Sequence, residues 1–228
     1  MTEVIDLEDS NVTCKDLEDF SWRYQDAVGA NLASMPIICG GYFRNGSDHS
    51  SEKCFVYIPK FGLGWRHFVS MIDRRAGAAG IVYENGFHIF GGYDRSTSTI
   101  LQSSEIVNED GTTTVGPQLP TPMHFHAIAS INSSVSIITG GVPKANTYTD
   151  KTWYFNHATR EFQPGSNLLK PRTFHSSATI TDQEYNEKYV MVAGGQSYSG
   201  LYMDTPEFLV DGEWLSYEGK THIELKQI

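Results

Sequence analysis

The sequence has few charged residues, few cysteines and no long hydrophobic segment. Charged residues make up 19% of the 228 residues, compared with about 25% in an average soluble protein. Lys and Arg number 17 and Asp and Glu number 27, so the formal net charge is −10. This charge disfavours a general affinity for nucleic acid or for anionic membranes. We therefore expect the partner to be another protein or a peptide, neutral or basic overall, and not a nucleic acid or a membrane.

No apolar run approaches the roughly 18 residues of a membrane span. The first residues, Met1 to Asp6, lack the basic and apolar regions of a secretory signal. We expect the chain to carry neither, which favours an intracellular location. An extracellular location stays open if the N-terminus is incomplete.

Three cysteines occur, Cys14, Cys39 and Cys54, and their spacings match no zinc or redox motif. They are either small buried thiols, or one disulfide joins Cys54 to Cys39 or to Cys14 in an oxidising compartment. N-glycosylation sequons do not settle the compartment, because a sequence rich in Ser and Thr has about two by chance. Three such sequons begin at Asn11, Asn45 and Asn132.

The sequence is comparatively rich in glycine and aromatic residues, which suits a β-rich protein, and it contains an internal repeat. A short apolar run that ends in two glycines occurs four times. The second glycines of these pairs lie 51, 49 and 54 residues apart. The pairs are Gly40 and Gly41, Gly91 and Gly92, Gly140 and Gly141, and Gly194 and Gly195.

Each repeat is predicted to form four short antiparallel strands. A turn such as Glu84-Asn85-Gly86 separates the first two apolar runs, and Asn-Gly is the strongest short hairpin signal. A third strand follows the glycines and a fourth follows a polar turn. The steps from Tyr57 to Trp65, Val107 to Val115 and Tyr154 to Phe162 are eight residues each, and the step from Phe208 to Trp214 is six.

Four strands in a unit of about 50 residues form one blade of a β-propeller. The apolar run, the Gly-Gly pair, the spacer and the two aromatic positions resemble the kelch repeat, although the second unit has Val107 and Val115 in place of aromatics. The resemblance implies an all-β, kelch-type propeller with blades over 27–75, 76–124, 125–173 and 174–219, a half blade over 1–22 and a tail over 220–228. Kelch rings commonly have six or seven blades, so we favour a partial, open ring.

The glycines and aromatic residues of this pattern have structural roles. A glycine pair at a strand end permits positive φ and close backbone approach, while large side chains fill the wedge between blades. The aromatic residues expected there are Tyr57, Trp65, Tyr154, Phe162, Phe208 and Trp214.

No catalytic motif is recognisable. His124 and His126 are predicted to share one face of a strand, a spacing that can bind zinc, but no Cys or carboxylate stands at a ligand-like interval. The sequence has no G-x-S-x-G elbow, no H-E-x-x-H and no phosphate-binding loop. We expect no catalytic residue, no metal and no cofactor. Some kelch-like propellers are copper oxidases or iron-dependent specifier proteins, so an enzyme with an unrecognised metal site is the minor alternative.

A binding face is predicted from topology. In an antiparallel meander the loops from strand 2 to strand 3 and the segments from strand 4 to the next blade emerge on one face. Tyr, Arg and His, which anchor protein interfaces, are concentrated there. The predicted binding residues are Tyr42, Arg44, Tyr93, Arg95, Tyr148 and Tyr198 in the loops, and Arg75, His126, Arg172 and His175 between blades.

Arg75 and Arg172 allow two interpretations. They either donate hydrogen bonds to a partner's carboxylate or carbonyl at the mouth of the ring, or they pair with acidic neighbours and brace adjacent blades. The resemblance implies a non-enzymatic protein-binding or peptide-binding scaffold, of the adaptor or substrate-recognition type. The alternative is an extracellular, disulfide-containing glycoprotein with kelch repeats.

Overall fold

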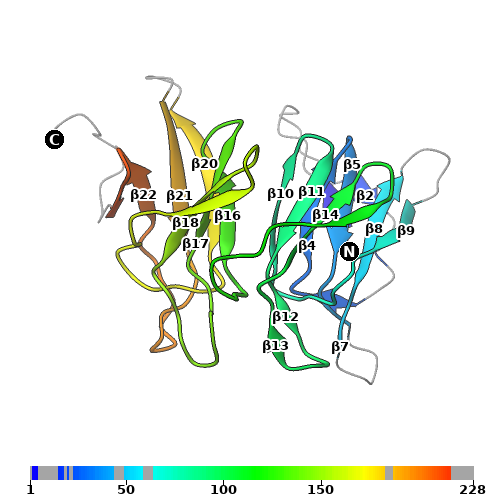
Figure 1. The fold of residues 1–228 in the computed structure, drawn as a ribbon, viewed down its shortest axis with the longest axis horizontal. Helices are drawn as coiled ribbons and strands as arrows, with labels where there is room; N and C mark the ends of the chain where they lie inside the picture. Colours follow the sequence, from blue (N-terminus) through cyan, green and yellow to red (C-terminus); the bar gives the residue numbers. More distant parts are fainter. Residues whose placement is uncertain are drawn as a thin grey trace.

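The computed structural model describes residues 2–4, 15–17, 20, 23–43, 49–58, 64–182 and 187–216. All helical or strand structure in these residues is β-strand, which confirms the prediction of an all-β protein (Figure 1). Within these ranges, no helix is long and apolar enough to cross a membrane. Cys14, Arg44 and the predicted tail over 220–228 lie outside the described residues.

Four sheets have four strands each, and each is an antiparallel meander within one unit of the sequence repeat. The first sheet contains β4 (Val28–Leu32), β5 (Met35–Cys39), β8 (Lys53–Ile58) and β9 (Gly64–Ser70). The second contains β10 (Ala79–Tyr83), β11 (Gly86–Phe90), β14 (Ser104–Asn108) and β15 (Thr113–Val115). The third contains β16 (Ala127–Ser130), β17 (Val135–Thr139), β18 (Thr152–Asn156) and β19 (Glu161–Pro164), and the fourth contains β20 (Ser176–Asp182), β21 (Glu187–Ala193), β22 (Glu207–Val210) and β23 (Glu213–Ser216).

Short strands lie outside these sheets. β1 (Thr2–Val4) pairs with β2 (Lys15–Leu17), in the region where a half blade was predicted. β3 (Tyr24–Gln25), β6 (Tyr42–Phe43) and β7 (His49–Ser50) form a small sheet, and β12 (Tyr93–Asp94) pairs with β13 (Thr99–Ile100). The loops that contain β7 and β12–β13 lie at the lower edge of the view, on the same side of the molecule (Figure 1).

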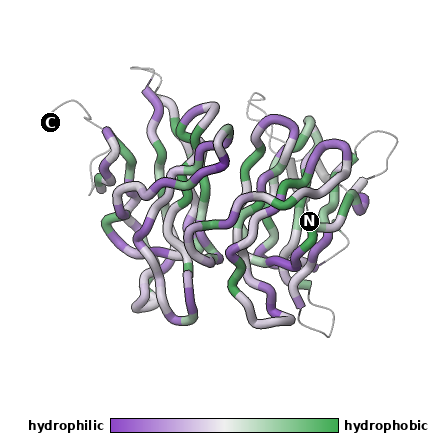
Figure 2. The backbone as a smooth tube through the Cα atoms, viewed as in Figure 1, coloured by the Kyte–Doolittle hydropathy of each residue, from purple (hydrophilic) through white to green (hydrophobic). Residues whose placement is uncertain are grey.

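The four sheets are arranged in chain order, with their first strands side by side. β4 contacts β10, β10 contacts β16, and β16 contacts β20. Three apolar clusters fill the spaces between consecutive sheets: one includes Leu32 and Phe87, one Phe90 and Phe155, and one Ile137 and Val192. Hydrophobic segments accordingly follow the strands (Figure 2). This arrangement is compatible with a β-propeller.

The glycine pairs join one sheet to the next. All eight glycines have positive φ, between 59° and 106°, a region that other residues rarely adopt. The second glycines Gly41, Gly92 and Gly141 each donate a 2.8 Å hydrogen bond to a carbonyl of the segment that leads into the following sheet. The acceptors are Arg75, Met123 and Arg172 respectively. A Cβ at Gly91 would lie 2.3 Å from the carbonyl oxygen of Met123, so this close approach requires glycine.

Tyr154, Phe162 and Trp214 pack in the clusters between sheets, as expected. The pairing implied by the constant step between strands 3 and 4 is correct in the first sheet and shifted in the others. Tyr57 pairs with Trp65, as expected. In the third sheet Phe162 pairs with the fully buried Phe155 and not with Tyr154. The constant step of eight fails because the turns between strands 3 and 4 differ in length, and a one-residue shift moves a side chain to the other face.

The same error affects the second and fourth sheets. Val107 is buried, but its partner is Thr113, and Val115 is 69% exposed. In the fourth sheet the buried Trp214 pairs with Leu209, while Phe208, also buried, projects to the other face. Val115 therefore does not replace an aromatic between sheets.

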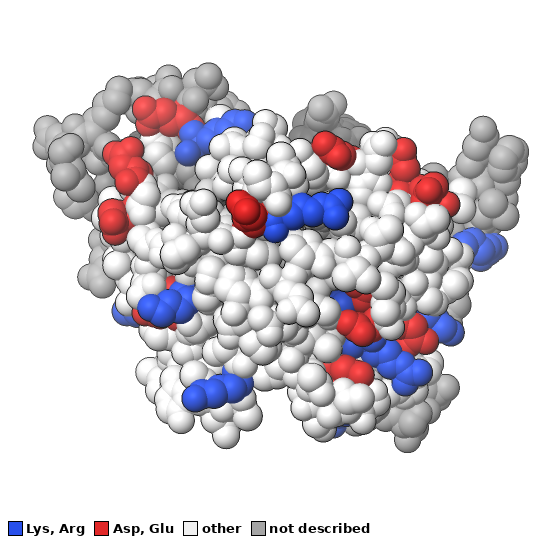
Figure 3. All heavy atoms as spheres, viewed as in Figure 1, with Lys and Arg blue, Asp and Glu red and all other residues white. Residues whose placement is uncertain are grey.

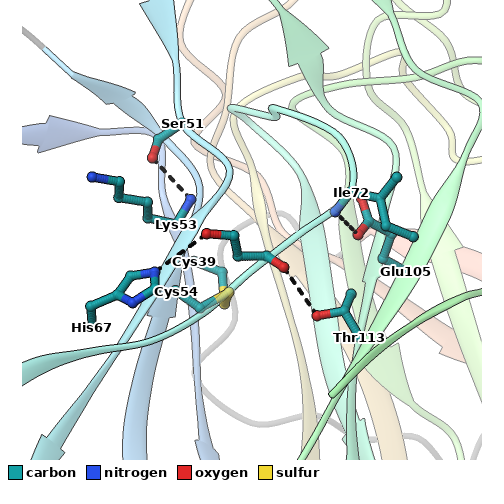
Figure 4. The surroundings of a disulfide bond; sticks show 9 residues. Cys39, Ser51, Lys53, Cys54, His67, Ile72, Glu105 and Thr113 are labelled. Atoms are coloured by element: carbon teal, nitrogen blue, oxygen red, sulfur yellow. Dashed lines mark hydrogen bonds between the residues drawn. A yellow bond between two sulfur atoms is a disulfide. The ribbon is translucent and has the colours of Figure 1, made fainter. Parts of the chain in front are cut away.

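A disulfide joins Cys39 to Cys54 across β5 and β8 (Figure 4). The two cysteines are direct cross-strand partners with Cα atoms 4.0 Å apart, and both are fully buried in the cluster between the first and second sheets. Nearby, the end of β9 is tied to the second sheet, because Thr113 donates a hydrogen bond to the carbonyl of Ser70. The spacing of the cysteines in the sequence did not decide between a disulfide and free thiols. The register of β5 and β8 places the two cysteines opposite each other.

Candidate binding site

The segments that lead into the four sheets converge at one place. Each contains one residue with a left-handed backbone, namely Asp26, Gly77, Phe125 and Phe174, with φ between 53° and 62°. Their backbones form a ladder: Gly77 N–H donates to Asp26 O (2.8 Å), Phe125 N–H to Gly77 O (2.7 Å) and Phe174 N–H to Phe125 O (3.1 Å). Consecutive units are thus linked edge to edge around a common centre.

A pocket of about 420 Å³ lies at this centre. Every unit contributes to its wall, and the residues that define its chemistry are Asp26, Gly77, Phe125, His126, Phe174 and His175. Its volume is in the range of about 300 to 1,000 Å³ that is typical of ligand sites. The predicted residues His126 and His175 therefore meet at one site.

The two histidines are buried and neutral. His126 is 5% exposed and His175 7%. Burial lowers the pKa of each to about 3, and the neighbouring imidazole and the Arg172 guanidinium add to the shift for His126 and His175 respectively. The Nε2 atom of His175 bonds the Thr139 hydroxyl (2.9 Å). Within the described part of the chain, neither ring nitrogen of His126 has a hydrogen-bond partner, and nor does Nδ1 of His175.

Asp26 is the charged side chain of the pocket wall at neutral pH. Partial burial raises the pKa of its carboxyl group. Since both histidines stay neutral, no cation among the described residues of the wall compensates for this carboxylate. The pocket is consequently acidic.

Two aromatic rings complete the wall. The Phe125 and Phe174 rings have centroids 3.9 Å apart, and Phe174 is 51% exposed. Phe125 fits because Gly77 has no side chain: a Cβ there would lie 2.6 Å from the ring. An exposed phenylalanine at the mouth of a pocket offers an apolar face to a ligand.

The loops around the pocket bring some predicted residues together. The Arg95 guanidinium lies over the Tyr42 ring, 5.5 Å from its centroid, and joins the loops of the first two sheets. Tyr93 stacks on His124 at 5.4 Å. On the side of the third and fourth sheets, Tyr148 packs edge-on against Tyr198 at 6.0 Å.

Among the described residues, the loop of the fourth sheet has the most exposed large apolar side chains of this face. Tyr198, Leu201 and Tyr202 are 70%, 69% and 83% exposed. Large apolar side chains that are gathered and exposed mark interaction surfaces. Tyr198 was predicted as a binding residue, whereas Leu201 was not.

Arg75 and Arg172 are fully buried, and their contacts favour the bracing interpretation over the binding one. Arg75 pairs with Glu105 at 2.5 Å and donates to the carbonyl of Gly91 (2.6 Å). Arg172 pairs with Glu207, which also accepts a hydrogen bond from Leu169 N–H (2.7 Å). Guanidinium groups without exposed surface cannot contact a partner at the mouth of the pocket, so neither arginine belongs to the candidate site.

The predicted histidine pair is not on one face of a strand. Phe125, between His124 and His126, has φ of 53° and so interrupts the extended backbone that would align the two side chains. His124 packs on Tyr93, and His126 is part of the pocket wall, with its ring buried beside Gly91. Among the described residues, no group of three or more His, Cys, Asp or Glu side chains is arranged to hold a metal ion.

Charge on the molecule is dispersed. Acidic and basic side chains are interspersed over the viewed face, with a broad uncharged area between them (Figure 3). The acidic character of the pocket is therefore local and comes from Asp26 and the absence of a nearby exposed cation on the wall.

Sequence reasoning missed Asp26, Phe125 and Phe174. A signal was available, because these residues and Gly77 occupy equivalent places two residues before the first strand of each sheet. Aligning the segments before the strands, and not only the glycine pairs, would have found them.

No family model and no curated protein matches this chain. Matches exist among solved structures, 180 chains in all. One of them, described as "Structure of YjhT", matches with a TM-score of 0.82 over 96% of this chain and 78% of that chain, at 12% sequence identity. At this identity the likeness establishes a shared fold alone.

Proposed function

We propose that the chain is a non-enzymatic binding module that recognises a protein or peptide with the face formed by the loops between strands 2 and 3 and the segments between sheets. The observation that carries the proposal is the convergence of all four units on one pocket, together with the exposed Tyr198 and Tyr202 in the loop between strands 2 and 3 of the fourth sheet. A pocket with an aromatic rim suits a side chain of an extended segment, while the rim holds its flanks. Adaptor or substrate-recognition roles use such a surface.

We further propose that the fold is a kelch-type β-propeller, with each four-stranded sheet a blade and the whole an open arc. The repeated glycine pairs and the backbone ladder support this reading. The ladder stops at its ends within the described residues, since Asp26 N–H and Phe174 O have no partner there. A Cβ at Gly194, unlike one at Gly140, would meet no described atom within 4 Å.

Light scattering tests the open arc. An arc leaves apolar strand faces uncovered at its ends, so the isolated chain should self-associate at tens of micromolar. A monodisperse monomer would indicate a closed small ring instead.

Selection of a displayed peptide library against the chain, followed by affinity measurements on the selected peptides, tests the binding function. The double variant Tyr198→Ala with Tyr202→Ala should lower the affinity for the selected peptides at least tenfold, because aromatic residues contribute about 2 kcal/mol or more at interface centres. The matched control is Glu109→Ala with Arg160→Ala, two exposed changes in turns of the opposite face. Equal losses for both pairs, or no selected peptide, would overturn the proposal.

The disulfide favours a second candidate, an extracellular glycoprotein with the same fold. Of the three sequons, the one at Asn132 lies in the described residues, on an exposed turn. The Asn132 Oδ1 accepts hydrogen bonds from the backbone N–H groups of Ser134 and Val135, both 2.9 Å, which directs the side chain's nitrogen away from the turn. Mass spectrometry of protein from a secreting eukaryotic cell would show a glycan at Asn132 if this candidate holds, and unmodified asparagine if it does not.

A further inference from the structure

The fourth sheet is built like the first three, but within the described residues no further four-stranded sheet follows it. The glycine pairs of the first three sheets are buried, whereas Gly194 and Gly195 are only half-buried. Ala129 of β16 is buried where β16 contacts β20, whereas Ala178, at the same place in β20, is exposed. We call the surface with Ala178, Gly194 and Gly195 the open end.

The three internal junctions show what an occupant of the open end must offer. Each second glycine donates to a carbonyl of the next segment, and each ladder carbonyl accepts an N–H from the next left-handed residue. At the open end, the Gly195 N–H and the Phe174 carbonyl have no such partner in the described residues. Four places before each acceptor carbonyl stands a buried apolar side chain that packs between two sheets, namely Met71, Leu119 or Leu168.

The segment that leads into the first sheet meets all three requirements. Tyr24 stands two places before the left-handed Asp26, which is the place of the acceptor carbonyl. Phe20 stands four places before Tyr24 and packs against Phe55 and Trp65, with ring centroids 5.4 and 5.1 Å apart. Within the described part of the chain, the Asp26 N–H has no acceptor and the Tyr24 carbonyl receives no glycine N–H. The two ends of the arc are therefore complementary in their backbone donors and acceptors.

The sequence that follows β23 fits the open end poorly. In the first three sheets the buried apolar residue comes four places after the fourth-strand residue at one fixed position of the pairing, in the steps from His67 to Met71, Val115 to Leu119 and Pro164 to Leu168. The same step from Ser216, which pairs with Glu207, reaches Lys220, outside the described residues. A charged lysine does not suit a buried apolar place.

Resting on the proposed open arc, we propose that the open end binds the first sheet of a second copy of this chain, head to tail. The Gly195 N–H would donate to the Tyr24 carbonyl of the second copy, and the Asp26 N–H of the second copy would donate to the Phe174 carbonyl. Phe20 of the second copy would pack against the glycine pair, as Met71 and Leu119 do at internal junctions. Such a contact is heterologous, because it joins different surfaces of the two copies.

Two variants each block one end. Ala178→Arg changes the exposed residue of the open end whose counterpart Ala129 is buried at a junction. Asn31→Arg changes an exposed residue of the first sheet whose counterpart Val82 packs in the cluster between the first and second sheets. Each variant should weaken self-association by about tenfold or more in sedimentation equilibrium, because an unpaired guanidinium is costly to bury.

Mixing the two variants tests the head-to-tail arrangement. Each variant keeps one intact end, so an equimolar mixture should form a one-to-one complex although neither variant associates alone. The matched control is Ala158→Arg, the same change at an exposed turn of the third sheet, and it should associate like the parent. Melting temperatures check the folding of every variant, and Ser176→Arg, also exposed on β20, replaces Ala178→Arg if that protein does not fold.

Self-association that survives both variants, or a mixture that stays monomeric, would overturn the inference and leave the open arc standing. A monomeric parent would overturn both. The proposed recognition function is tested separately, since selected peptides should bind the monomeric Ala178→Arg protein as tightly as the parent. Loss of the tyrosine dependence with assembly intact would overturn that function and leave the head-to-tail contact standing.

Discussion

Between the first and second sheets, and between the third and fourth, a buried arginine meets a glutamate of the following sheet, whereas the junction of the second and third sheets is apolar. The carbonyls of Arg75, Met123 and Arg172 accept equivalent glycine hydrogen bonds, so the three residues occupy the same place. Met123 belongs to an apolar cluster with Phe90 and Phe155.

The residues opposite these positions change in the same manner. Glu105, Trp153 and Glu207 each pair with the residue two places before the first glycine of their sheet. An arginine is therefore present where a glutamate can neutralise it, and a methionine where the opposite residue is Trp153. One backbone geometry tolerates either chemistry as long as both partners match, because an unpaired buried charge is costly.

Breaking one ion pair should give the largest effect. Arg172→Met leaves Glu207 buried without its partner and should destabilise the protein by about 3 to 5 kcal/mol. Adding Glu207→Leu makes the junction resemble that of Met123 and should restore most or all of the loss. Urea unfolding of both variants measures the difference. A double variant as unstable as the single one would contradict the idea that the two chemistries are interchangeable.

Removing the disulfide should be next in size. It closes a loop with a sequence separation of 15 residues in the first sheet, and a loop of about this length corresponds to about 3 kcal/mol. Unfolding of Cys39→Ala with Cys54→Ala, compared with the parent protein with and without a reductant, gives this value. A parent protein whose stability is the same in reductant as without it would show that the cysteines are thiols.

The two glycines that face different surroundings should respond differently to alanine. Both Gly140 and Gly194 have positive φ, which alone costs alanine about 1 to 2 kcal/mol. A Cβ at Gly140 would also lie 2.6 Å from the Arg172 carbonyl oxygen, and one at Gly194 meets nothing in the described chain. Gly140→Ala should therefore be clearly less stable than Gly194→Ala by thermal unfolding. Equal costs would mean that Gly194 has a neighbour too.

Mild acid should lower the free energy of unfolding through the two histidines of the pocket wall. His126 and His175 have pKa values of about 3 in the folded protein and about 6.5 when unfolded. The unfolded state thus binds more protons below pH 6.5, so stability is full above that pH and falls toward pH 3. The slope is about 1.4 kcal/mol per pH unit for each histidine.

Denaturant unfolding between pH 5.5 and 4.5 measures this slope, because the unfolded histidines are then almost fully protonated while His126 and His175 are still neutral in the folded protein. His126→Phe should flatten it by the contribution of one histidine. An unchanged slope in that variant would show that His126 is protonated in the folded protein.

The sequence predicted the all-β architecture and the repeated four-stranded sheets, because the glycine pairs report a strict backbone requirement. Gly40, Gly91 and Gly140 each approach the carbonyl of the next segment so closely that a Cβ would not fit, which explains their regular spacing in the sequence. The register of the third and fourth strands was harder, since turn length varies and Phe162 pairs with Phe155 instead of Tyr154, although both Phe155 and Tyr154 pack in clusters between sheets.

The site was only partly predictable. His126 and His175 were identified as site residues from their place between blades, and the structure places both at the pocket wall. The roles of Arg75 and Arg172 depend on glutamates 30 and 35 residues further along the chain, a pairing that only the register of β14 and β22 brings about. Asp26, Phe125 and Phe174 share a left-handed backbone. Their side chains have nothing in common that would indicate this conformation from the sequence.

Peptide affinities on matched variants test the central claim most directly. Peptides selected against the chain are measured on the parent protein, on Tyr198→Ala with Tyr202→Ala, and on Glu109→Ala with Arg160→Ala, with the folding of each variant checked by its melting temperature. The tyrosine pair should lower the affinity at least tenfold, and the control pair should leave it unchanged. Equal losses in the two folded variants would contradict recognition by the face that carries Tyr198 and Tyr202.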